Sequence, residues 1–554
     1  MMNQFWWSII AGIFIGIGSQ HAALAQQSLL QEALANISAD SIRQHIAVLG
    51  HDSLQGRGTG TSGEQKAARY IAQYLHRIGI RPLGDHGSYF QSIPMHGSFP
   101  RPRSEFLYFA QGKEHAFVLD RDFLLYKSGA QTYIPQPVPL VFVGYGIIAP
   151  EFDYNDYQSV DVEGKVVVCL FGEPPSDDPS YFNGPDPTIY SCPEAKQRFA
   201  IARGALGTIL IPRPEDRYSD WARAMNDFAF EDITLAYSPA GNLAVLMNPE
   251  PAQRLFADGS ISLDDIFQMD RSGAIHSFPL SGKVSFKGEF QERDFFSANV
   301  IGWLPGINQP PFQKYVIISA HYDHLGIGPA VKGDSIYNGV IDNAAGVAAV
   351  LELARVFASL PIKPLQSVIF LFLTGEEKGL LGSTYYIDHP VVPLYKTIAN
   401  INVDGLALFD VFRDVIGIGA EYSYLQEHLV QVAAGLGLEV SYFPLGCMAM
   451  EAFVRSDQLA FARAGIPSIL ISEGFSYHNR NREDGLQWIN YWMQNYYHSP
   501  FDDLNQPLNF EAARQHCQLL FAFCHPIADG AFYPDWKPGS PYLMARLRSL
   551  AEKR

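Results

Sequence analysis

Cysteine is scarce in this chain, and its few residues are scattered. Only five occur among 554 residues, and no two of them form a CxxC pair. A zinc site built on thiolates is therefore not expected, and an odd number excludes complete pairing within one chain. One disulfide is possible and none is required, so the composition excludes a dense disulfide framework.

Clusters of Lys and Arg are also missing, and the balance of charge is acidic. The formal net charge is -17, and the isoelectric point is about 5.4. Because binding to a phosphate backbone requires clustered basic residues, no nucleic-acid partner is expected. With 47% hydrophobic and 18% charged residues, the chain has the composition of a globular protein with two or more domains.

The sequence has a single long apolar run, at the N-terminus. Residues 5–17 are apolar, and Ala23-Leu-Ala25 fits a small-x-small cleavage site. This pattern predicts a signal peptide over residues 1–25, cleaved after Ala25, and an exported protein that is periplasmic or secreted. Since no Lys or Arg precedes the run, a retained N-terminal anchor is the alternative, and only then would the protein contact a membrane.

Helical spacing of apolar residues predicts two helices after this segment, over residues 40–49 and 63–78. The Gly-rich stretch 54–63 lies between them. It lacks the GK[ST] ending of a phosphate loop and a preceding strand, so we expect it to form backbone turns.

The pattern changes to short β-type runs from about residue 136, with examples at 140–148, 165–171 and 207–211. The segment up to residue 289 has no tight cluster of His and carboxylates. We therefore predict that residues 136–289 form a separate, β-rich and non-catalytic module.

Beyond this module, strands and helices alternate. Apolar runs predict strands over 315–320, 367–374 and 397–403, and helical patterns predict helices over 343–358 and 380–388. Nearly continuous apolar strands alternating with helices predict an α/β fold, with a mostly parallel central sheet covered by helices on both faces. Ligands of such sheets bind at the carboxyl ends of the strands.

Ionisable residues stand at the end of each predicted strand. His321 and Asp323 follow the first strand in AHYDHLG, Glu376 and Glu377 follow the second in TGEEKG, and Asp404 follows the third. Several carboxylates at one buried rim repel one another unless cations compensate their charge. The arrangement therefore predicts a metal site.

Asp342, which opens a helix, and His498, in YYHSP, can join the same rim. Imidazole and carboxylate without thiolate suit zinc or another borderline divalent ion, and the excess of carboxylates favours two ions that share a bridging ligand. In the Glu376-Glu377 pair, one residue can bind metal while its neighbour takes a proton from water. Other histidines are interpreted as packed, structural or surface residues: His324, His51, His76 and His389.

The ordered motifs HYDHLG, GVIDNAAG, TGEEKGLLGS and YHSP resemble the co-catalytic zinc aminopeptidase family, which includes bacterial leucyl aminopeptidases and glutamate carboxypeptidase II. NVIGWLPG at 299–306 and the Gly-rich helix entry extend the likeness over the whole peptidase part. The resemblance implies a peptidase domain divided between residues 26–135 and 290–554. It also implies that the inserted module over 136–289 is a protease-associated domain.

The resemblance also implies a ligand set for two zinc ions per chain. Asp342 would bridge the two ions, Glu377 and His498 would complete one site, and His321 and Asp404 would complete the other. The implied function is that of a di-zinc aminopeptidase, which removes N-terminal residues from peptides through a water that bridges the metals.

Two further roles follow from the resemblance. Glu376 would be the general base, and Asp323 would orient the His321 imidazole from behind, which fixes its tautomer. The chain departs from the family at Gln458, where relatives commonly have His, and at Phe453, where some have a Tyr phenol that helps hold the oxyanion. Tyr496 or Tyr497 is the candidate replacement for that phenol.

Three alternatives stay open at this point. The same metal core serves carboxypeptidases or dipeptidases, a glutaminyl cyclase-like enzyme would use one zinc ion, and a receptor-like binding protein would have kept the fold without activity. The filled ligand positions disfavour the last. The sequence leaves the preferred N-terminal residue, the peptide length and the oligomeric state open.

Overall fold

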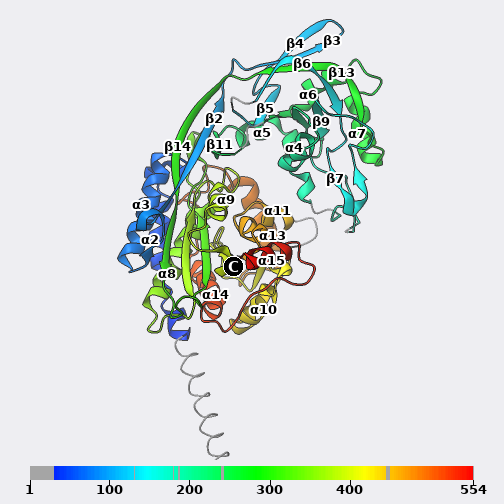
Figure 1. Cartoon of the computed structure of the whole chain (residues 1–554). Helices are drawn as coiled ribbons and strands as arrows, with labels where there is room; N and C mark the ends of the chain where they lie inside the picture. The colour runs from blue at the N-terminus through cyan, green and yellow to red at the C-terminus, as the bar shows by residue number, and fades with distance from the viewer. Residues whose placement is uncertain are drawn as a thin grey trace, which may run out of the picture.

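Two bodies, each built on one large sheet, make up the computed structural model of the chain, and two long strands run from one body to the other (Figure 1). The predicted signal peptide, residues 1–25, and Cys447 lie outside the described residues. The structure describes residues 30–129, 132–178, 180–184, 188–238, 242–443 and 449–552.

The larger sheet has ten strands in the order β11-β2-β14-β18-β15-β19-β22-β20-β21, with β1 paired to β14. Their bounds are β1 Arg81–Pro82, β2 Phe90–Pro100, β11 Asp232–Leu235, β14 Phe290–Leu304, β15 Tyr315–His321, β18 Ser367–Leu373, β19 Thr397–Asn402, β20 Asp414–Ile418, β21 Glu439–Val440 and β22 Ser468–Glu473. The three strands predicted from apolar runs are β15, β18 and β19, each within one residue of its expected bounds.

Only the centre of this sheet is a continuous parallel array. Strands β18, β15, β19 and β22 are parallel neighbours. On the flanks, β11, β2, β14 and β18 pair antiparallel in turn, as do β22 and β20. The expected mostly parallel sheet is therefore confined to the central strands. The flank was missed because buried and exposed residues alternate along β2, a weaker signal than the unbroken apolar run of a central strand.

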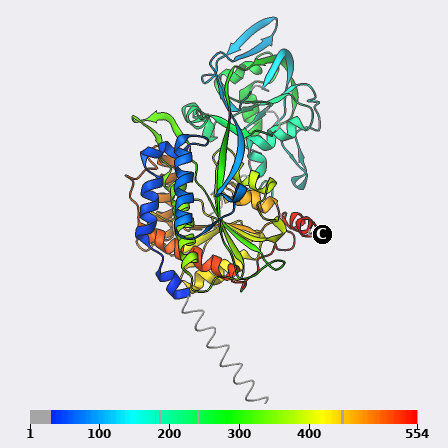
Figure 2. The same cartoon turned by 60° about the vertical axis from the view of Figure 1, so that its left-hand side comes forward.

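Helices cover both faces of the sheet (Figures 1 and 2). All seven residues of β15 are buried. Val316 and Ile318 pack in one apolar cluster with α2, α3, α8 and α14, whereas Ile317 packs on the other face with α9 and α12. Burial on both sides explains why β15 reads as a continuous apolar run.

The four helices predicted from the sequence are α2, α3, α8 and α9, each within three residues of its expected bounds, and α10 to α15 are additional. The bounds are α2 Ala39–Leu49, α3 Ser62–Arg77, α8 Gly346–Ser359, α9 Leu381–Asp388, α10 Leu425–Gly435, α11 Ala449–Val454, α12 Gln458–Arg463, α13 Arg482–Asn495, α14 Phe510–Ala528 and α15 Leu543–Ala551. The hydroxyl of Thr61 caps α3 by accepting a hydrogen bond from the Glu64 N–H. Along the chain, a small hairpin of β16 (Gly326–Val331) and β17 (Asp334–Tyr337) lies between β15 and α8.

The second body contains an eight-stranded mixed sheet in the order β4-β3-β13-β6-β9-β10-β12-β5. Its strands are β3 Glu105–Ala110, β4 Lys113–Phe117, β5 Phe123–Lys127, β6 Tyr133–Phe142, β9 Val166–Leu170, β10 Gly207–Ile211, β12 Leu243–Met247 and β13 Phe278–Lys287. The short pair β7 Ile148–Ala149 and β8 Tyr154–Asn155 joins them, with helices α4 Pro193–Ile201, α5 Trp221–Asp227, α6 Pro249–Ala252 and α7 Leu263–Ser272.

The strands of this second sheet extend over residues 105–287, whereas the expected module covers 136–289. The earlier strands β3, β4 and β5 belong to this sheet because β3 pairs with β13, β4 pairs with β3, and β5 pairs with β12. Conversely, β11 lies within 136–289 but pairs with β2 in the larger sheet. The identity of this body as a protease-associated domain stays a prediction.

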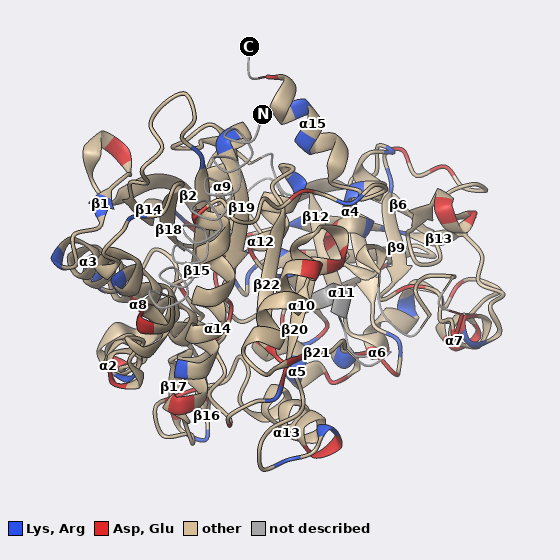
Figure 3. Ribbon diagram, turned by 90° about the horizontal axis from the view of Figure 1, so that it is seen from below, with Lys and Arg blue, Asp and Glu red and all other residues tan. Residues whose placement is uncertain are grey.

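Charged side chains are spread over both bodies. Figure 3 shows Lys and Arg interspersed with Asp and Glu on helices and loops. Among the helices of the described ranges, none combines the length and apolar character needed to cross a membrane. Within the same ranges, Cys169, Cys517 and Cys524 are free thiols.

Glu473 ends β22 next to β20, and its side chain is buried. Burial, with a smaller contribution from Asp414, raises the pKa of Glu473 from 4.5 to about 8. Because the pKa is raised in the folded protein, the Glu473 carboxyl of the unfolded chain loses its proton at a lower pH than that of the folded chain. The stability from this group is therefore present below pH 4.5 and is lost as the pH rises to about 8.

We predict that Glu473→Gln raises the free energy of unfolding at pH 8 by about 1–3 kcal/mol and changes it little at pH 4. Urea unfolding at both pH values measures this difference. Glu439→Gln, at an exposed position of β21, is the matched control and should change neither value. An equal gain at pH 4 and pH 8 would contradict the assignment.

Candidate metal centre

The predicted site residues meet at the carboxyl ends of the central parallel strands. Five turns deliver them: His321 ends β15, Glu376 and Glu377 follow β18, Asp404 follows β19, Asp342 precedes α8, and His498 follows α13. Strands with continuous apolar sequence bring these turns to one rim because parallel neighbours end at the same edge.

Asp342 lies between two imidazoles. The distance from Asp342 Oδ1 to His321 Nε2 is 3.3 Å, and that from Asp342 Oδ2 to His498 Nε2 is 3.2 Å. His321 Nε2 also lies 3.2 Å from Asp404 Oδ1, and His498 Nε2 lies 3.3 Å from Glu377 Oε2. The two oxygens of one carboxylate thus face two separate sets of donor atoms.

The spacing of these donor atoms fits zinc. Ligand atoms about 2.0–2.1 Å from a tetrahedral zinc ion lie about 3.3 Å apart, which is the separation observed in both sets. A charge-assisted N–H···O bond is shorter, about 2.7–2.9 Å. In the described part of the chain, the buried His498 Nε2 has no hydrogen-bond partner. The donor set therefore suits a divalent cation better than a hydrogen-bonded network.

The carboxylates control the ionisation of both imidazoles. Burial lowers the pKa of His498, but Glu377 and Asp342 raise it more, to about 10. Burial likewise lowers the pKa of His321, and Glu376 and Asp404 raise it to a net value well above the ordinary one. Protons on the imidazoles and a bound cation are alternative ways to compensate the same negative charge.

Glu376 has a different environment from its neighbour Glu377. Burial and the nearby Asp404 carboxylate outweigh the opposing effect of His321, so the pKa of Glu376 lies well above its ordinary value. For Glu377, the favourable charges of His498 and His324 overcome burial and hold the pKa below its ordinary value. One carboxyl is thus suited to carry a proton and the other to remain an anion.

Asp323 lies behind His321 and connects two turns of the site. Its Oδ1 is 3.7 Å from His321 Nδ1, while the backbone carbonyl of Asp323 is 3.2 Å from the same nitrogen. The Asp323 carboxylate accepts hydrogen bonds from the Glu376 N–H (3.2 Å) and from Thr59 Oγ1 (2.9 Å). Its role in orienting His321 stays a prediction.

His324, interpreted from the sequence as a packed residue, lies inside the site. It is fully buried, with Nδ1 2.6 Å from Glu377 Oε1 and 3.9 Å from Asp342 Oδ2. Because Glu377 Oε2 faces His498, the contact with His324 fixes which oxygen points into the centre. The sequence feature that could have indicated its place in the site is the i, i+3 spacing of His321 and His324.

Neither departure from the family motif points at the centre. Phe453 packs in an apolar cluster against Tyr422 and Tyr542, with ring centroids 5.5 and 6.0 Å away. Gln458 accepts a hydrogen bond from Asn402 and donates one to the Phe453 carbonyl. Tyr497 instead stacks on His498 at a centroid distance of 3.9 Å. Of the two Tyr candidates, the stacked Tyr497 has the contact with the site.

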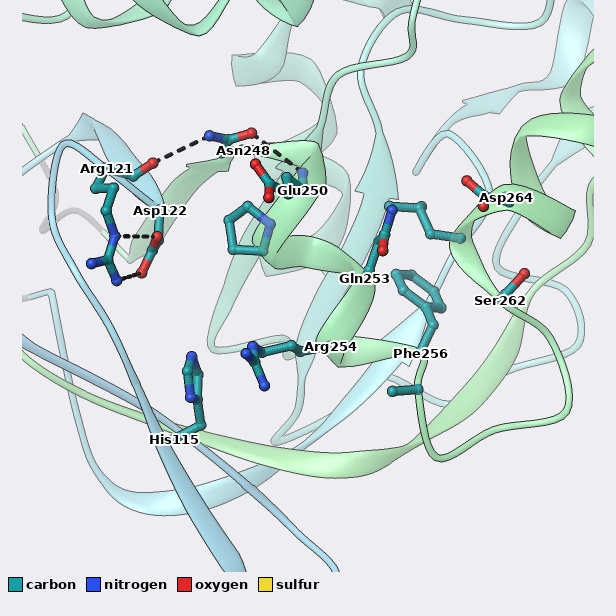
Figure 4. A pocket seen from close by; sticks show the side chains of 13 residues that line it. His115, Arg121, Asp122, Asn248, Glu250, Gln253, Arg254, Phe256, Ser262 and Asp264 are labelled. Atoms are coloured by element: carbon teal, nitrogen blue, oxygen red, sulfur yellow. Dashed lines mark hydrogen bonds and ion pairs between the residues drawn. The ribbon is translucent and has the colours of Figure 1, made fainter.

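A cavity of about 710 Å³ lies in the second body (Figure 4). His115, Arg121, Asp122, Asn248 and Arg254 contribute to its lining, and its lining includes no member of the metal-binding set. The structure therefore separates this cavity from the candidate metal centre.

The fold and site define an α/β protein with a carboxylate–imidazole metal centre at the rim of its sheet. Residues 299–524 match the sequence model of Peptidase family M28, and this range contains every residue of the predicted metal-binding set. The predicted resemblance to the zinc aminopeptidases is thereby confirmed for the metal-bearing part of the chain.

Individual relatives agree with this family. A probable zinc metalloprotease of Pyrenophora tritici-repentis is 36% identical over 104 residues, which are 18% of this chain and 22% of that protein. Aminopeptidase YwaD of Bacillus subtilis is 27% identical over 215 residues, 38% of this chain and 40% of that protein. The chain thus matches well under half the length of these curated relatives.

The fold has a counterpart among solved structures. An aminopeptidase from Aneurinibacillus sp. strain AM-1 superposes with a TM-score of 0.54 at 19% identity, covering 90% of this chain and 96% of that one. The similarity extends over both bodies and supports the α/β fold.

We predict that His324→Phe lowers zinc affinity by about 10- to 100-fold, because Glu377 loses the hydrogen bond that selects its inward-facing oxygen. Competition with a chromophoric chelator measures the affinity. His389→Phe is the control, since exposed His389 stacks on Tyr385 away from the metal-binding set. Equal zinc affinity in the His324 variant and wild type would exclude this role.

Proposed function

We propose that this protein is an exported di-zinc aminopeptidase that removes N-terminal residues from peptides. The observation that carries the proposal is the position of Asp342, whose two oxygens face His321 on one side and His498 on the other. The match of residues 299–524 to Peptidase family M28 supports peptide hydrolysis. The export follows from the predicted signal peptide over residues 1–25.

The residues would hold two ions in two sets that share Asp342. His321 and Asp404 would bind one ion, and His498 and Glu377 would bind the other. When bound, the zinc ions would lower the pKa of a water and polarise the scissile carbonyl. Two bound ions would compensate the charge of the many carboxylates at this buried rim.

Glu376 would move the proton. Its raised pKa suits a group that takes a proton from the attacking water and returns it to the leaving amine. The Glu376 N–H donates to Asp323, so the base and the His321 turn are held by the same carboxylate. Tyr497, stacked on His498, is the candidate for a hydroxyl that would stabilise the oxyanion.

Substrate choice separates this proposal from its alternatives. We expect about two zinc ions per chain, and hydrolysis of aminoacyl substrates with a free amine that stops on chelation and returns with zinc. Elemental analysis and a panel of free and N-blocked peptides measure this. Cleavage of only N-blocked peptides would favour a carboxypeptidase, whereas one zinc without hydrolysis would favour a cyclase-like enzyme. Two zinc ions without hydrolysis of any substrate would indicate a binding protein.

We predict that Glu376→Gln retains zinc and lowers kcat by about 10²- to 10⁴-fold, because the amide cannot accept the proton. Steady-state kinetics with parallel metal analysis distinguish loss of the base from loss of metal. Glu439→Gln again serves as the control. A variant that hydrolyses substrate at the wild-type rate would remove Glu376 as the base.

A further inference from the structure

The Gly-rich stretch 54–63 is the one sequence motif that the proposed function leaves without a role, and it lies directly behind the metal centre. Gly58 pairs with His324 in an isolated β-bridge, and the His324 N–H donates to the Arg57 carbonyl at 3.3 Å. Gly56 has a φ of 66° and passes close to the carbonyls of Tyr337 and Gly326. The loop thus approaches the site through turns that glycine permits.

Arg57, in the middle of this loop, is one of the largest fully buried side chains, with 1% exposure. Its guanidinium donates four hydrogen bonds to backbone carbonyls: Nε to Tyr322 at 2.9 Å, one terminal nitrogen to Leu49 and Asn338 at 2.6 Å each, and the other to Gly339 at 2.8 Å. Four acceptors from three chain segments therefore meet at one side chain.

Two of these segments carry predicted metal ligands. Tyr322 stands between His321 and Asp323, and Gly339 is three residues before Asp342. The planar guanidinium, with five donors in a fixed fork, can hold two turns at a set separation, which a flexible ammonium cannot do. The separation of these turns determines the distance between His321 Nε2 and Asp342 Oδ1.

Within the described part of the chain, the Arg57 guanidinium bonds only to backbone carbonyls. In the ranges that the structure describes, no carboxylate lies within ion-pair distance of Arg57. Burial lowers the pKa of Arg57, while Asp502 and Asp323 raise it, as do Asp342 and Glu377. Burying a cation is costly, and an apolar side chain would fill such a place at lower cost if only packing were required. The carboxylates of the site are the groups that compensate this cation.

The neighbouring residues support the same turns. Thr59 donates to Asp323 Oδ2 at 2.9 Å. Asp502 accepts from the N–H groups of Ile341 and Asp342 at 2.9 and 3.0 Å, so the Asp342 turn is held from both sides. The loop and Asp502 thus hold the His321 and Asp342 turns through hydrogen bonds.

We propose that Arg57 is a positioning residue of the metal centre, which sets the distance between the His321 and Asp342 turns through their backbone carbonyls. The proposal rests on the proposed di-zinc function. It assigns to the N-terminal part of the chain a role in a site whose predicted ligands all lie beyond residue 320.

The test is zinc affinity of Arg57→Met and Arg57→Lys, measured by competition with a chromophoric chelator on the full chain. We expect a loss of about 10- to 100-fold for Met. Lys should give a smaller loss, because it keeps the charge but offers fewer donors without the planar fork. The visible absorption of the Co²⁺-loaded Lys variant should also differ from wild type, since it reports the coordination geometry.

Arg546→Met is the matched control. Arg546 is also buried and donates to a backbone carbonyl, that of Thr397 at 3.0 Å, at the opposite end of β19 from Asp404. Its substitution should lower the free energy of unfolding and leave zinc affinity and the Co²⁺ spectrum unchanged. If Arg57 contributed to stability alone, its substitution would likewise lower the free energy of unfolding and leave zinc affinity and the Co²⁺ spectrum unchanged.

The outcomes separate the two proposals. Wild-type zinc affinity and an unchanged Co²⁺ spectrum in the Arg57 variants would overturn the positioning role alone. A wild-type protein that binds no zinc would overturn the proposed function and this inference with it. If Arg57→Met fails to fold, the Lys variant decides, because weaker zinc binding and an altered spectrum support the role and wild-type values overturn it.

Discussion

Repulsion between carboxylates that converge on one buried rim is the constraint on which the rest of this structure depends. Asp342, Glu376, Glu377 and Asp404 lie at the ends of adjacent strands or in the turns beside them. Such a cluster is stable only when imidazoles, cations or backbone N–H groups compensate its charge. The two imidazoles that face Asp342 and the N–H groups that hold Asp502 and Asp323 follow from this requirement. The same requirement explains why the site suits divalent metal.

Compensation on this scale needs rigid support, and the fold supplies it from distant parts of the chain. The central strands are buried on both faces, so their carboxyl ends cannot shift independently. Behind the rim, Arg57 contacts a carbonyl 265 residues away in sequence. The second body is joined through the β2–β14 ladder, whose eleven paired residues continue the larger sheet toward it (Figure 1). The catalytic geometry we propose is therefore a property of the whole peptidase body.

Sequence patterns predicted the central elements well because their signals are local. Continuous apolar runs correspond to β15, β18 and β19, and helical spacing corresponds to α2 and α3. The antiparallel flank was missed because buried and exposed residues alternate along β2. The early strands β3 and β5 were not assigned to the second sheet because their partners, β13 and β12, lie far along the chain. In the site, the strand-end residues His321 and Asp404 were expected to meet and do so. His324 was not expected to contact Glu377, because a histidine in a turn has no pattern that distinguishes packing from function.

What the sequence determined by itself was the class of chemistry: imidazoles and carboxylates without thiolates, at the ends of apolar strands, suit divalent metal and a water-activating base. Only the tertiary structure decided the distances at which Asp342 faces its two donor sets, the contact of His324 with one oxygen of Glu377, and the bonds by which Arg57 joins the His321 and Asp342 turns. The physical reason is that hydrogen bonds and metal ligation depend on distances of a few tenths of an ångström. Segments hundreds of residues apart acquire such distances only when the core packs them together.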